Sequence, residues 1–227
     1  MRTLLLAAAL VAASSPALAQ KSSDPDKNVA DGGVKVAGWE ARLDRPNAKL
    51  DDLKFVTMGP GFHVTSGPAA IYWNPATTTA KVGAKGYTVK GTFTQTKAPT
   101  HPEAYGVFAM GSELAGANEN YAYLLVRGDG KFMVKHRYHD QVHTLADWTE
   151  NAAVKKADAA GKATNEVAIN VAPQTTTFWV NGTQVLSLAS KDIVGPMKAE
   201  SLDGIAGIRV NHNLDVHIAG FSVTPNK

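Results

Sequence analysis

The sequence predicts an all-β protein, an antiparallel two-sheet sandwich with at most one short helix. Beyond Lys35 the chain is a succession of short runs rich in Val, Ile, Thr, Tyr, Phe and Trp, separated by Gly, Pro and Asn. Several runs alternate apolar and polar residues, as a strand buried on one face does. Hairpin-length connections exclude the βαβ alternation of a parallel sheet. We expect about a dozen strands.

Residues 1–19 have the organisation of a signal peptide. Arg2 supplies the positive charge, residues 4–13 form the apolar region, and residues 17–19 (ALA) are a small-residue cleavage site. We expect cleavage after Ala19 and a periplasmic or secreted protein. The apolar region is too short for a membrane span, which takes roughly 20 residues, and no later run approaches that length. Since the chain has no cysteine, we expect neither a lipid anchor nor disulfides.

The remaining chain is expected to form one domain. Residues 20–35 are polar and lack periodicity, which favours a flexible lead-in, whereas residues 36–227 show strand patterns without an internal repeat. A sandwich of that length buries enough surface to be stable without disulfides. The formal net charge of +3 comes from basic residues spread along the chain, so no nucleic-acid partner is expected.

The strand patterns are clearest in the middle of the chain. Residues 87–95 (YTVKGTFTQ) alternate apolar and polar positions, and residues 166–171 (EVAINV) repeat the pattern. In residues 121–148, two strand-like runs flank the Gly128-Asp129-Gly130 turn and a third follows directly, which predicts a β-meander. Residues 178–182 (FWVNG) end in an Asn-Gly hairpin turn.

Toward the C-terminus the pattern changes twice. Only residues 192–203 have helical character, and Gly195-Pro196 breaks it, so we expect no more than one short helix. In the last strand, the apolar residues stand at even-numbered positions in residues 214–218 and at odd-numbered positions in residues 221–223. A bulge near Ala219-Gly220 would reconcile the two phases.

Long stretches of the chain resemble the concanavalin A-like jelly-roll superfamily. They are YAYLLVRGDGKFMVKHR with the Trp148 strand, NEVAI at residues 165–169, FWVNG, and the closing GIAGIRVNHNLDVHIAGFSV. Within the superfamily the chain is most similar to laminin-G-like domains and to the 3-keto-disaccharide hydrolase group of secreted bacterial proteins. The resemblance covers residues 39–224 and implies a two-sheet jelly roll with a concave face that many relatives use for carbohydrate. A shared fold does not determine a function.

Motifs of known hydrolases are absent from the sequence. Retaining glucanases of this superfamily carry a Glu-x-Asp-x-x-Glu strand, because acid and nucleophile lie about 5 Å apart across the scissile bond. That pattern does not occur, and neither do Gly-x-Ser-x-Gly, His-Glu-x-x-His or a phosphate-binding glycine loop. The motifs therefore leave open whether the protein is an enzyme.

The candidate catalytic residues are His136, His139 and His143. If Asp140-Gln141 is a two-residue turn, His136 and His143 lie diagonally on one face of a hairpin and His139 lies on the other face with Arg137. An imidazole pair is able to share a proton or bind a divalent metal ion. The competing interpretation is a solvated strand end, and the sequence requires no cofactor.

The residues beside the Gly128-Asp129-Gly130 turn are candidates for ligand binding. If Phe132 and Val134 face the core, the alternating polar residues face the open side of the sheet. A three-residue loop puts Tyr121 and Tyr123 on that side, and a two-residue loop reverses them. Aromatic rings beside Arg and His donors suit sugars, whereas the alternative places the tyrosines in the core. The candidate ligand-binding residues are Tyr121, Tyr123, Lys135, Arg137, His139, Trp148 and Trp179.

Three functions fit these patterns. The first is an exported domain that binds saccharide on a concave sheet face. The second is a glycoside-processing enzyme of the 3-keto-glycoside hydrolase or lyase type, in which a histidine base, with or without a metal, replaces paired carboxylates. The third is a non-catalytic envelope adhesion domain. The sequence decides neither the sugar nor the oligomeric state.

Overall fold

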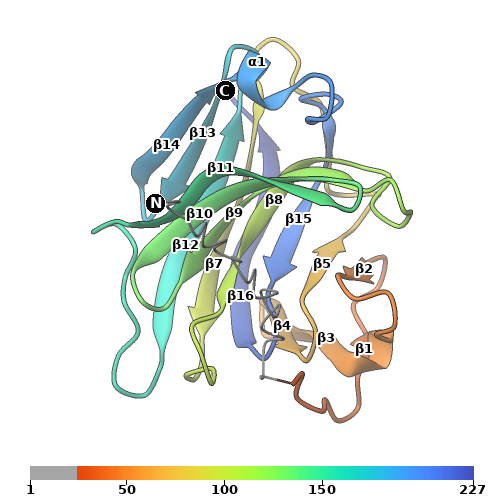
Figure 1. The fold of residues 1–227 in the computed structure, drawn as a ribbon, viewed down its shortest axis with the longest axis vertical. Coiled ribbons are helices and arrows are strands. Elements are labelled where there is room, and N and C mark those ends of the chain that lie inside the picture. Colours follow the sequence, from red (N-terminus) through yellow and green to blue (C-terminus); the bar gives the residue numbers. More distant parts are fainter. Residues whose placement is uncertain (1–24) are drawn as a thin grey trace, which may run out of the picture.

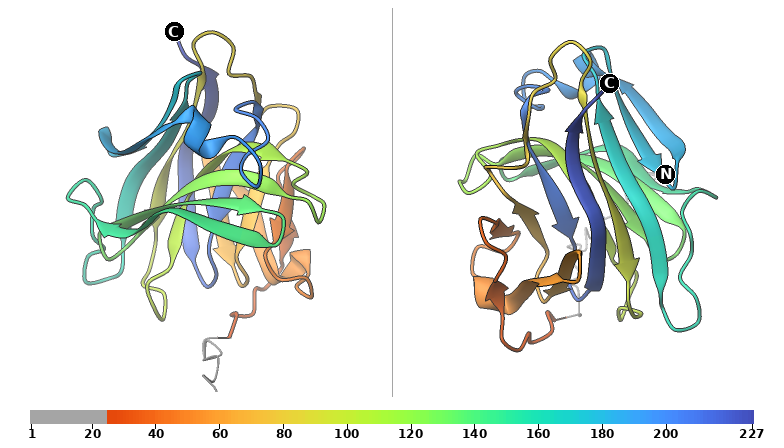
Figure 2. Two further views of the ribbon diagram at one scale, coloured as in Figure 1. Left: turned by 45° about the horizontal axis from the view of Figure 1, so that its top comes forward. Right: turned by 180° about the vertical axis from the view of Figure 1, so that it is seen from behind.

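The computed structural model describes residues 25–227, so the expected signal peptide lies outside the described residues. Two sheets pack face to face, and strands β9, β10 and β11 of the second sheet cross in front of the first (Figure 1). Seen from behind, the first sheet faces the viewer (Figure 2, right). In order, the first sheet contains β1 (Gly33–Val34), β3 (Leu53–Met58), β4 (Gly61–Ser66), β16 (Asp215–Pro225), β7 (Tyr87–Gln95), β12 (Ala163–Val171), β13 (Thr175–Val180) and β14 (Thr183–Ala189). The second contains β11 (Gln141–Glu150), β10 (Lys131–Tyr138), β9 (Asn120–Arg127), β8 (Ala104–Ser112), β15 (Gly204–Val210), β5 (Ala70–Trp73) and β2 (Glu40–Leu43), with β6 (Thr79–Ala80) beside β15.

The predicted antiparallel sandwich is confirmed. Among the named strands of residues 25–227, every pair is antiparallel except β1 and β3. Helical structure there is limited to a 3-10 turn, η1 (Leu50–Asp52), and one helix, α1 (Ser190–Ile193). The helix begins two residues earlier than expected and ends before Gly195. No helix in the described part of the chain is long and apolar enough to cross a membrane.

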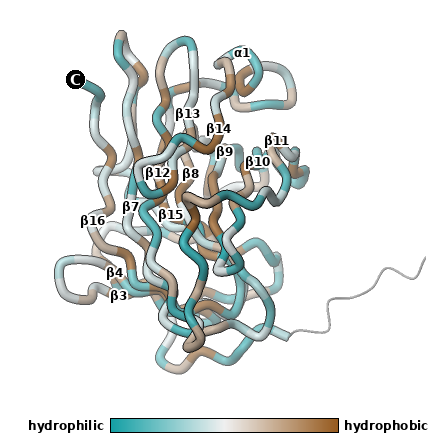
Figure 3. Tube along the Cα trace, turned by 90° about the vertical axis from the view of Figure 1, so that its left-hand side faces the viewer, coloured by the Kyte–Doolittle hydropathy of each residue, from teal (hydrophilic) through white to brown (hydrophobic). Residues whose placement is uncertain are grey.

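The main core fills the space between the two sheets. Val89 and Phe93 of β7 and Val167 and Ile169 of β12 are fully buried in it, as their alternation predicted. Burying such side chains is the dominant stabilising term in folding, at roughly 2 kcal/mol each. In Figure 3 the hydrophobic segments lie mostly within the strands, and the loops are mostly hydrophilic.

The structure contains the predicted bulge and decides between the two loop lengths considered for the turn at Gly128-Asp129-Gly130. The register of β16 against β7 shifts between Ala219 and Ser222, where Gly220 adopts a φ of +60°. This is the expected bulge, and glycine suits it because it tolerates positive φ without a Cβ clash. The loop between β9 and β10 has three residues, since Arg127 pairs with Lys131.

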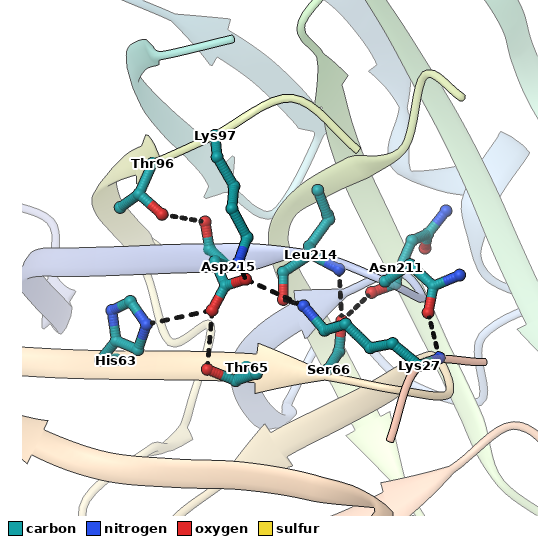
Figure 4. A network of polar contacts seen from close by, with 10 residues as sticks. Lys27, His63, Thr65, Ser66, Thr96, Lys97, Asn211, Leu214 and Asp215 are labelled. Carbon is teal, nitrogen blue, oxygen red and sulfur yellow. Dashed lines mark hydrogen bonds and ion pairs between the residues drawn. The ribbon is translucent and has the colours of Figure 1, made fainter. Parts of the chain in front are cut away.

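Asp215 of the first sheet forms an ion pair with Lys27, near the beginning of the described chain (Figure 4). Its carboxylate accepts hydrogen bonds from Lys27 at 2.9 Å and Thr65 at 2.8 Å, and pairs with Lys97 at 2.7 Å. His63 lies 3.6 Å away. Lys27 falls in the stretch expected as a flexible lead-in, and it also donates to the backbone carbonyl of residue 214 at 2.9 Å.

These contacts make Asp215 a source of pH-dependent stability. Burial alone would raise the pKa of Asp215, but hydrogen bonds from His63, Lys97 and Lys27 hold it far below its usual range. A carboxyl group with a lowered folded-state pKa stabilises the fold above its unfolded pKa of about 4, and this stabilisation is lost as the pH falls further.

We predict that Asp215→Asn lowers the free energy of unfolding by about 2 kcal/mol at pH 7, because charged hydrogen bonds are lost. The difference from wild type should shrink as the pH falls below about 4. Denaturant unfolding at pH 7 and pH 3 measures both effects. Asp140→Asn, in an exposed turn, is the control and should change little. A constant difference at both pH values would contradict the assignment.

Candidate functional site

The second sheet carries a separate apolar cluster on its outer face, which points away from the main core. Side chains alternate along β9, so Ala122 and Leu124 enter the main core whereas Tyr121 and Tyr123 lie on the outer face. The outer-face cluster consists of Ile71, Trp73, Ala104, Phe108, Leu114, Tyr121, Tyr123, Leu125 and Met133. Trp148 and Ile205 pack against it.

The three-residue loop between β9 and β10 determines which residues lie beside the tyrosines. Arg137 is the cross-strand partner of Tyr121, and Lys135 is the partner of Tyr123. Because Phe132 faces the main core, Lys135 and Arg137 share the outer face with both tyrosines. The facing predicted for a three-residue loop is therefore confirmed.

A bidentate ion pair lies above these tyrosines. Arg209 of β15 contacts both carboxylate oxygens of Asp44, at 3.1 and 2.5 Å, and donates to the Tyr121 hydroxyl at 3.0 Å. Its guanidinium carbon lies 4.8 Å from the centre of the Tyr123 ring. The Arg209 side chain is only 6% exposed. Its charge is thus compensated by one carboxylate, one hydroxyl and one aromatic face.

Two further arginines and a second carboxylate extend this pair. Arg137 Nη2 lies 3.6 Å from Asp44 Oδ2, and Arg137 Nε lies 3.6 Å from Glu119 Oε1. Arg42 Nη1 approaches Glu119 Oε2 to 3.0 Å. We call Arg42, Asp44, Glu119, Arg137 and Arg209 the charged cluster. It has three positive and two negative groups, and Arg137 Nε has no hydrogen-bond partner among the described residues.

The two carboxylates of the charged cluster differ in their pKa values. Burial would raise the pKa of Asp44, but the charge and hydrogen bonds of Arg209, with the charge of Arg137, hold it below the usual range. Burial raises the pKa of Glu119, and its arginine neighbours only partly oppose this effect. Pairs of titratable groups with divergent pKa values are typical of functional sites.

The tyrosine rings are not an exposed platform. Tyr121 is fully buried and Tyr123 is 3% exposed. The alternative that both tyrosines are buried is therefore correct, but they are buried in the outer-face cluster and not in the main core between the sheets. Trp148 is half-buried, with the Arg127 guanidinium 4.3 Å from the centre of its ring. Recognition at this face would therefore depend mainly on polar groups.

Two clefts border the outer face. One, of about 360 Å³, is lined by Arg42 and Asp44 of the charged cluster and by the following segment around Pro46. The other, of about 250 Å³, is lined by Trp73 and Leu114 of the outer-face cluster, among others. Each is near the lower end of the size range of small-molecule sites.

The candidate catalytic histidines do not form one site. The turn is His139-Asp140 rather than Asp140-Gln141, because Tyr138 pairs with Gln141. His136 therefore lies directly opposite His143 instead of diagonally, with ring centres 5.8 Å apart. His139 is in the turn, with a φ of +58°, and stacks on Tyr138 at 4.0 Å. The expected shared face of His139 and Arg137 was wrong, since the turn begins one residue earlier.

His136 is buried on the side of β10 that faces the main core. Its Nε2 lies 2.7 Å from Asn120 Oδ1, and Asn120 Nδ2 donates to the Lys198 carbonyl. Asn120 Oδ1 must therefore accept, so the neutral ring carries its proton on Nε2. Burial lowers the pKa of His136 to about 4, and the charges of His143 and Lys198 add to the effect.

The remaining tryptophan candidate lies elsewhere. Trp179 of β13 is half-buried on the outer side of the first sheet, where its Nε1 donates to Thr177 Oγ1 at 2.8 Å. The sequence analysis missed Asp44, Glu119 and Arg209. The alternation of β15, with buried Ile208 beside Arg209, places Arg209 on the outer face. No local pattern indicates that Asp44 meets it.

Comparison with known proteins identifies the fold. No family model matches the chain, and no curated protein matches its sequence. Among solved structures, the carbohydrate-binding module CBM66 from Bacillus subtilis matches with a TM-score of 0.55 and 10% identity, over 87% of this chain and 99% of its own. The fold is a concanavalin A-like jelly roll.

Two other jelly rolls show the same likeness. A Bacillus subtilis protein with a galectin-like fold matches with a TM-score of 0.57 and 13% identity, over 82% of this chain and 89% of its own. The β-glucanase of Bacillus licheniformis matches with a TM-score of 0.51 and 8% identity, over 89% and 96%. At these identities the likeness shows the jelly-roll fold alone.

The buried His136 should make stability depend on pH. A histidine with a lowered folded-state pKa destabilises the fold once the unfolded chain binds its proton, below about pH 6.5. We predict that wild type loses roughly 2 kcal/mol between pH 7.5 and pH 5 through this group, and that His136→Gln removes this part of the loss. Denaturant titrations at both pH values provide the measurement. An unchanged pH dependence in the variant would show that His136 does not cause it.

Proposed function

We propose that this protein is an exported jelly roll that binds saccharide on the outer face of its second sheet, at the charged cluster. The observation that carries the proposal is the set of arginines and carboxylates on the outer face of the sheet. A sugar offers neighbouring hydroxyls, each both a donor and an acceptor, so a carboxylate beside a guanidinium matches a hydroxyl pair.

The environment of the charged cluster supports this proposal. Its side chains are held before a ligand arrives, because Asp44 is fixed by Arg209, and Glu119 by Arg42. Preorganised polar groups lose little entropy on binding. Arg137 Nε is buried beside Glu119, but the Arg137 side chain as a whole is 14% exposed, so part of the guanidinium is open to a ligand oxygen. The adjoining cleft at Arg42 and Asp44 gives one sugar unit room.

The names of the similar structures support the same substrate class. One is a carbohydrate-binding module and another is a β-glucanase. The signal-peptide pattern of residues 1–19 favours export, where extracellular or envelope glycans are encountered. The polar character of the cluster favours recognition through hydroxyls over stacking on Tyr121 or Tyr123.

We predict that a glycan array finds ligands for the wild type and that Arg137→Ala binds them about 10-fold more weakly, because a charged hydrogen bond is lost. Lys90→Ala, on the exposed side of the first sheet, is the control and should bind normally. Isothermal titration gives the affinities, and thermal unfolding verifies the folding of each variant. If no glycan binds the wild type, or if both variants bind equally well, the proposal is wrong.

A glycoside-processing enzyme is the second candidate function, and the divergent pKa values of Asp44 and Glu119 favour it. A carboxyl group with a raised pKa serves as a general acid, and a carboxylate with a lowered pKa remains ionised as a base or stabilising charge. In this candidate the carboxylates take the role first considered for His136, His139 and His143, of which His136 is buried on the side of the main core and His139 lies in the turn.

If the protein is such an enzyme, Glu119→Gln should lower kcat on a glycoside or 3-keto-glycoside at least about 100-fold, because the proton donor is lost. The wild-type rate should fall as the pH rises through the raised pKa of Glu119, since only the protonated acid donates. His143→Gln should keep full activity. Turnover that survives Glu119→Gln would exclude this site, and a lack of turnover on all such substrates would exclude the candidate.

A further inference from the structure

A second group of chemically active side chains, none of which belongs to the charged cluster, lies where β8 begins and β15 ends. His101 and Glu103 lie just before β8, and His212 follows β15. The two strands pair up to Val210 and Tyr105, and the backbone N–H of residue 211 donates to the carbonyl of residue 104 at 2.9 Å. This pairing brings together side chains that are distant in the sequence.

The donor atoms of these three residues converge. Glu103 Oε1 lies 2.7 Å from His212 Nε2 and 3.0 Å from His101 Nδ1. One ligand atom from each residue lies within 4.8 Å of the others. In a tetrahedral zinc site with bonds of about 2.0–2.1 Å, ligand atoms are about 3.3 Å apart. To admit a metal ion, the two contacts of Glu103 would lengthen by roughly 0.3–0.6 Å, and the ligand atoms of the two imidazoles would have to lie at about this separation as well.

The surroundings of His212 match the support that metal-bound histidines receive. Its second ring nitrogen, Nδ1, lies 3.3 Å from Asp26 Oδ1, and Arg45 holds the other Asp26 oxygen at 2.7 Å. A carboxylate behind a ligating imidazole orients the ring and increases its basicity. In this structure Asp26 Oδ1 and His212 Nδ1 are buried without a well-directed hydrogen bond.

A purely structural interpretation would make the group a hydrogen-bonded His–Glu–His cluster. In that case one oxygen, Glu103 Oε1, accepts from both imidazoles. The geometry also leaves one side of the group open. His101 and Glu103 line a surface cleft of about 270 Å³, whose other walls include Pro99 and Asp129. An ion held by three protein ligands would face this cleft with its remaining coordination position.

We propose that His101, Glu103 and His212 bind a divalent transition metal ion of the zinc class in a three-ligand site open to this cleft. Two imidazoles and one carboxylate suit zinc better than calcium or magnesium, which prefer sets of oxygen ligands. The proposal is independent of saccharide binding at the charged cluster.

The test uses the full chain purified without a histidine tag and stripped with a chelator. Isothermal titration with Zn²⁺ should show one site per chain, and Zn²⁺ should raise the Tm, because an ion that binds the folded state stabilises it. Co²⁺ should give the intense visible absorption of a four- or five-coordinate site. The absence of Zn²⁺ and Co²⁺ binding would overturn the proposal.

The variants distinguish a metal site from a hydrogen-bonded cluster. Glu103→Gln keeps the shape of the side chain, and His101→Gln changes a side chain that is 40% exposed, so both should fold. Each should weaken Zn²⁺ binding at least about 100-fold, and Asp26→Asn about 10-fold. His143→Gln should bind normally. Zn²⁺ binding that persists in Glu103→Gln and His101→Gln, both shown to be folded by circular dichroism, would refute the assignment.

Discussion

The ion pair between the buried Arg209 and the half-buried Asp44 holds the outer face of the second sheet in place. It orients the Tyr121 hydroxyl, covers the Tyr123 ring, and leaves Asp44 able to face Arg137 as well. Removing Asp44 would destabilise the fold, because the buried charge of Arg209 would have no equivalent partner. The arrangement of the whole charged cluster therefore depends on this contact.

Stability alone does not account for such a pair. The main core already joins the two sheets, and well-packed apolar residues often stabilise a fold as well as a buried ion pair does. Charged groups fixed over aromatic rings, by contrast, give directed donors and acceptors at little entropic cost when a polar ligand binds. The proposed recognition of a polar ligand would give the charged cluster a role beyond cohesion.

The sequence predicted the features that local alternation and turn chemistry control. The faces of β7 and β12, the bulge at Gly220 and the outer position of Tyr121 follow from a period of two residues and from loop length. The histidines show the limit of this reasoning. Placing the turn one residue too late moved His139 onto the wrong face, because a slip of one residue reverses every side chain in a strand.

The charged cluster could not be predicted because its partners meet only through tertiary contacts. Arg209 and Asp44 belong to strands and loops at distant points of the sequence, and neither has a local motif. The sequence left the burial of Tyr123 as one of two alternatives for a related reason, since the guanidinium of Arg209 lies over its ring. Alternation predicts the direction of a side chain but not what lies over it.

The same two segments of backbone serve both groups of polar residues. Asp44 pairs with Arg209 on the outer face, while its neighbour Arg45 holds Asp26, which in turn faces His212. One short stretch after β2 and another at the end of β15 thus position the charged cluster and the His101–Glu103–His212 group together. This geometry lets one pair of strand ends support two chemically different sites, with Arg–carboxylate donors on the sheet face and imidazole ligands at the strand ends.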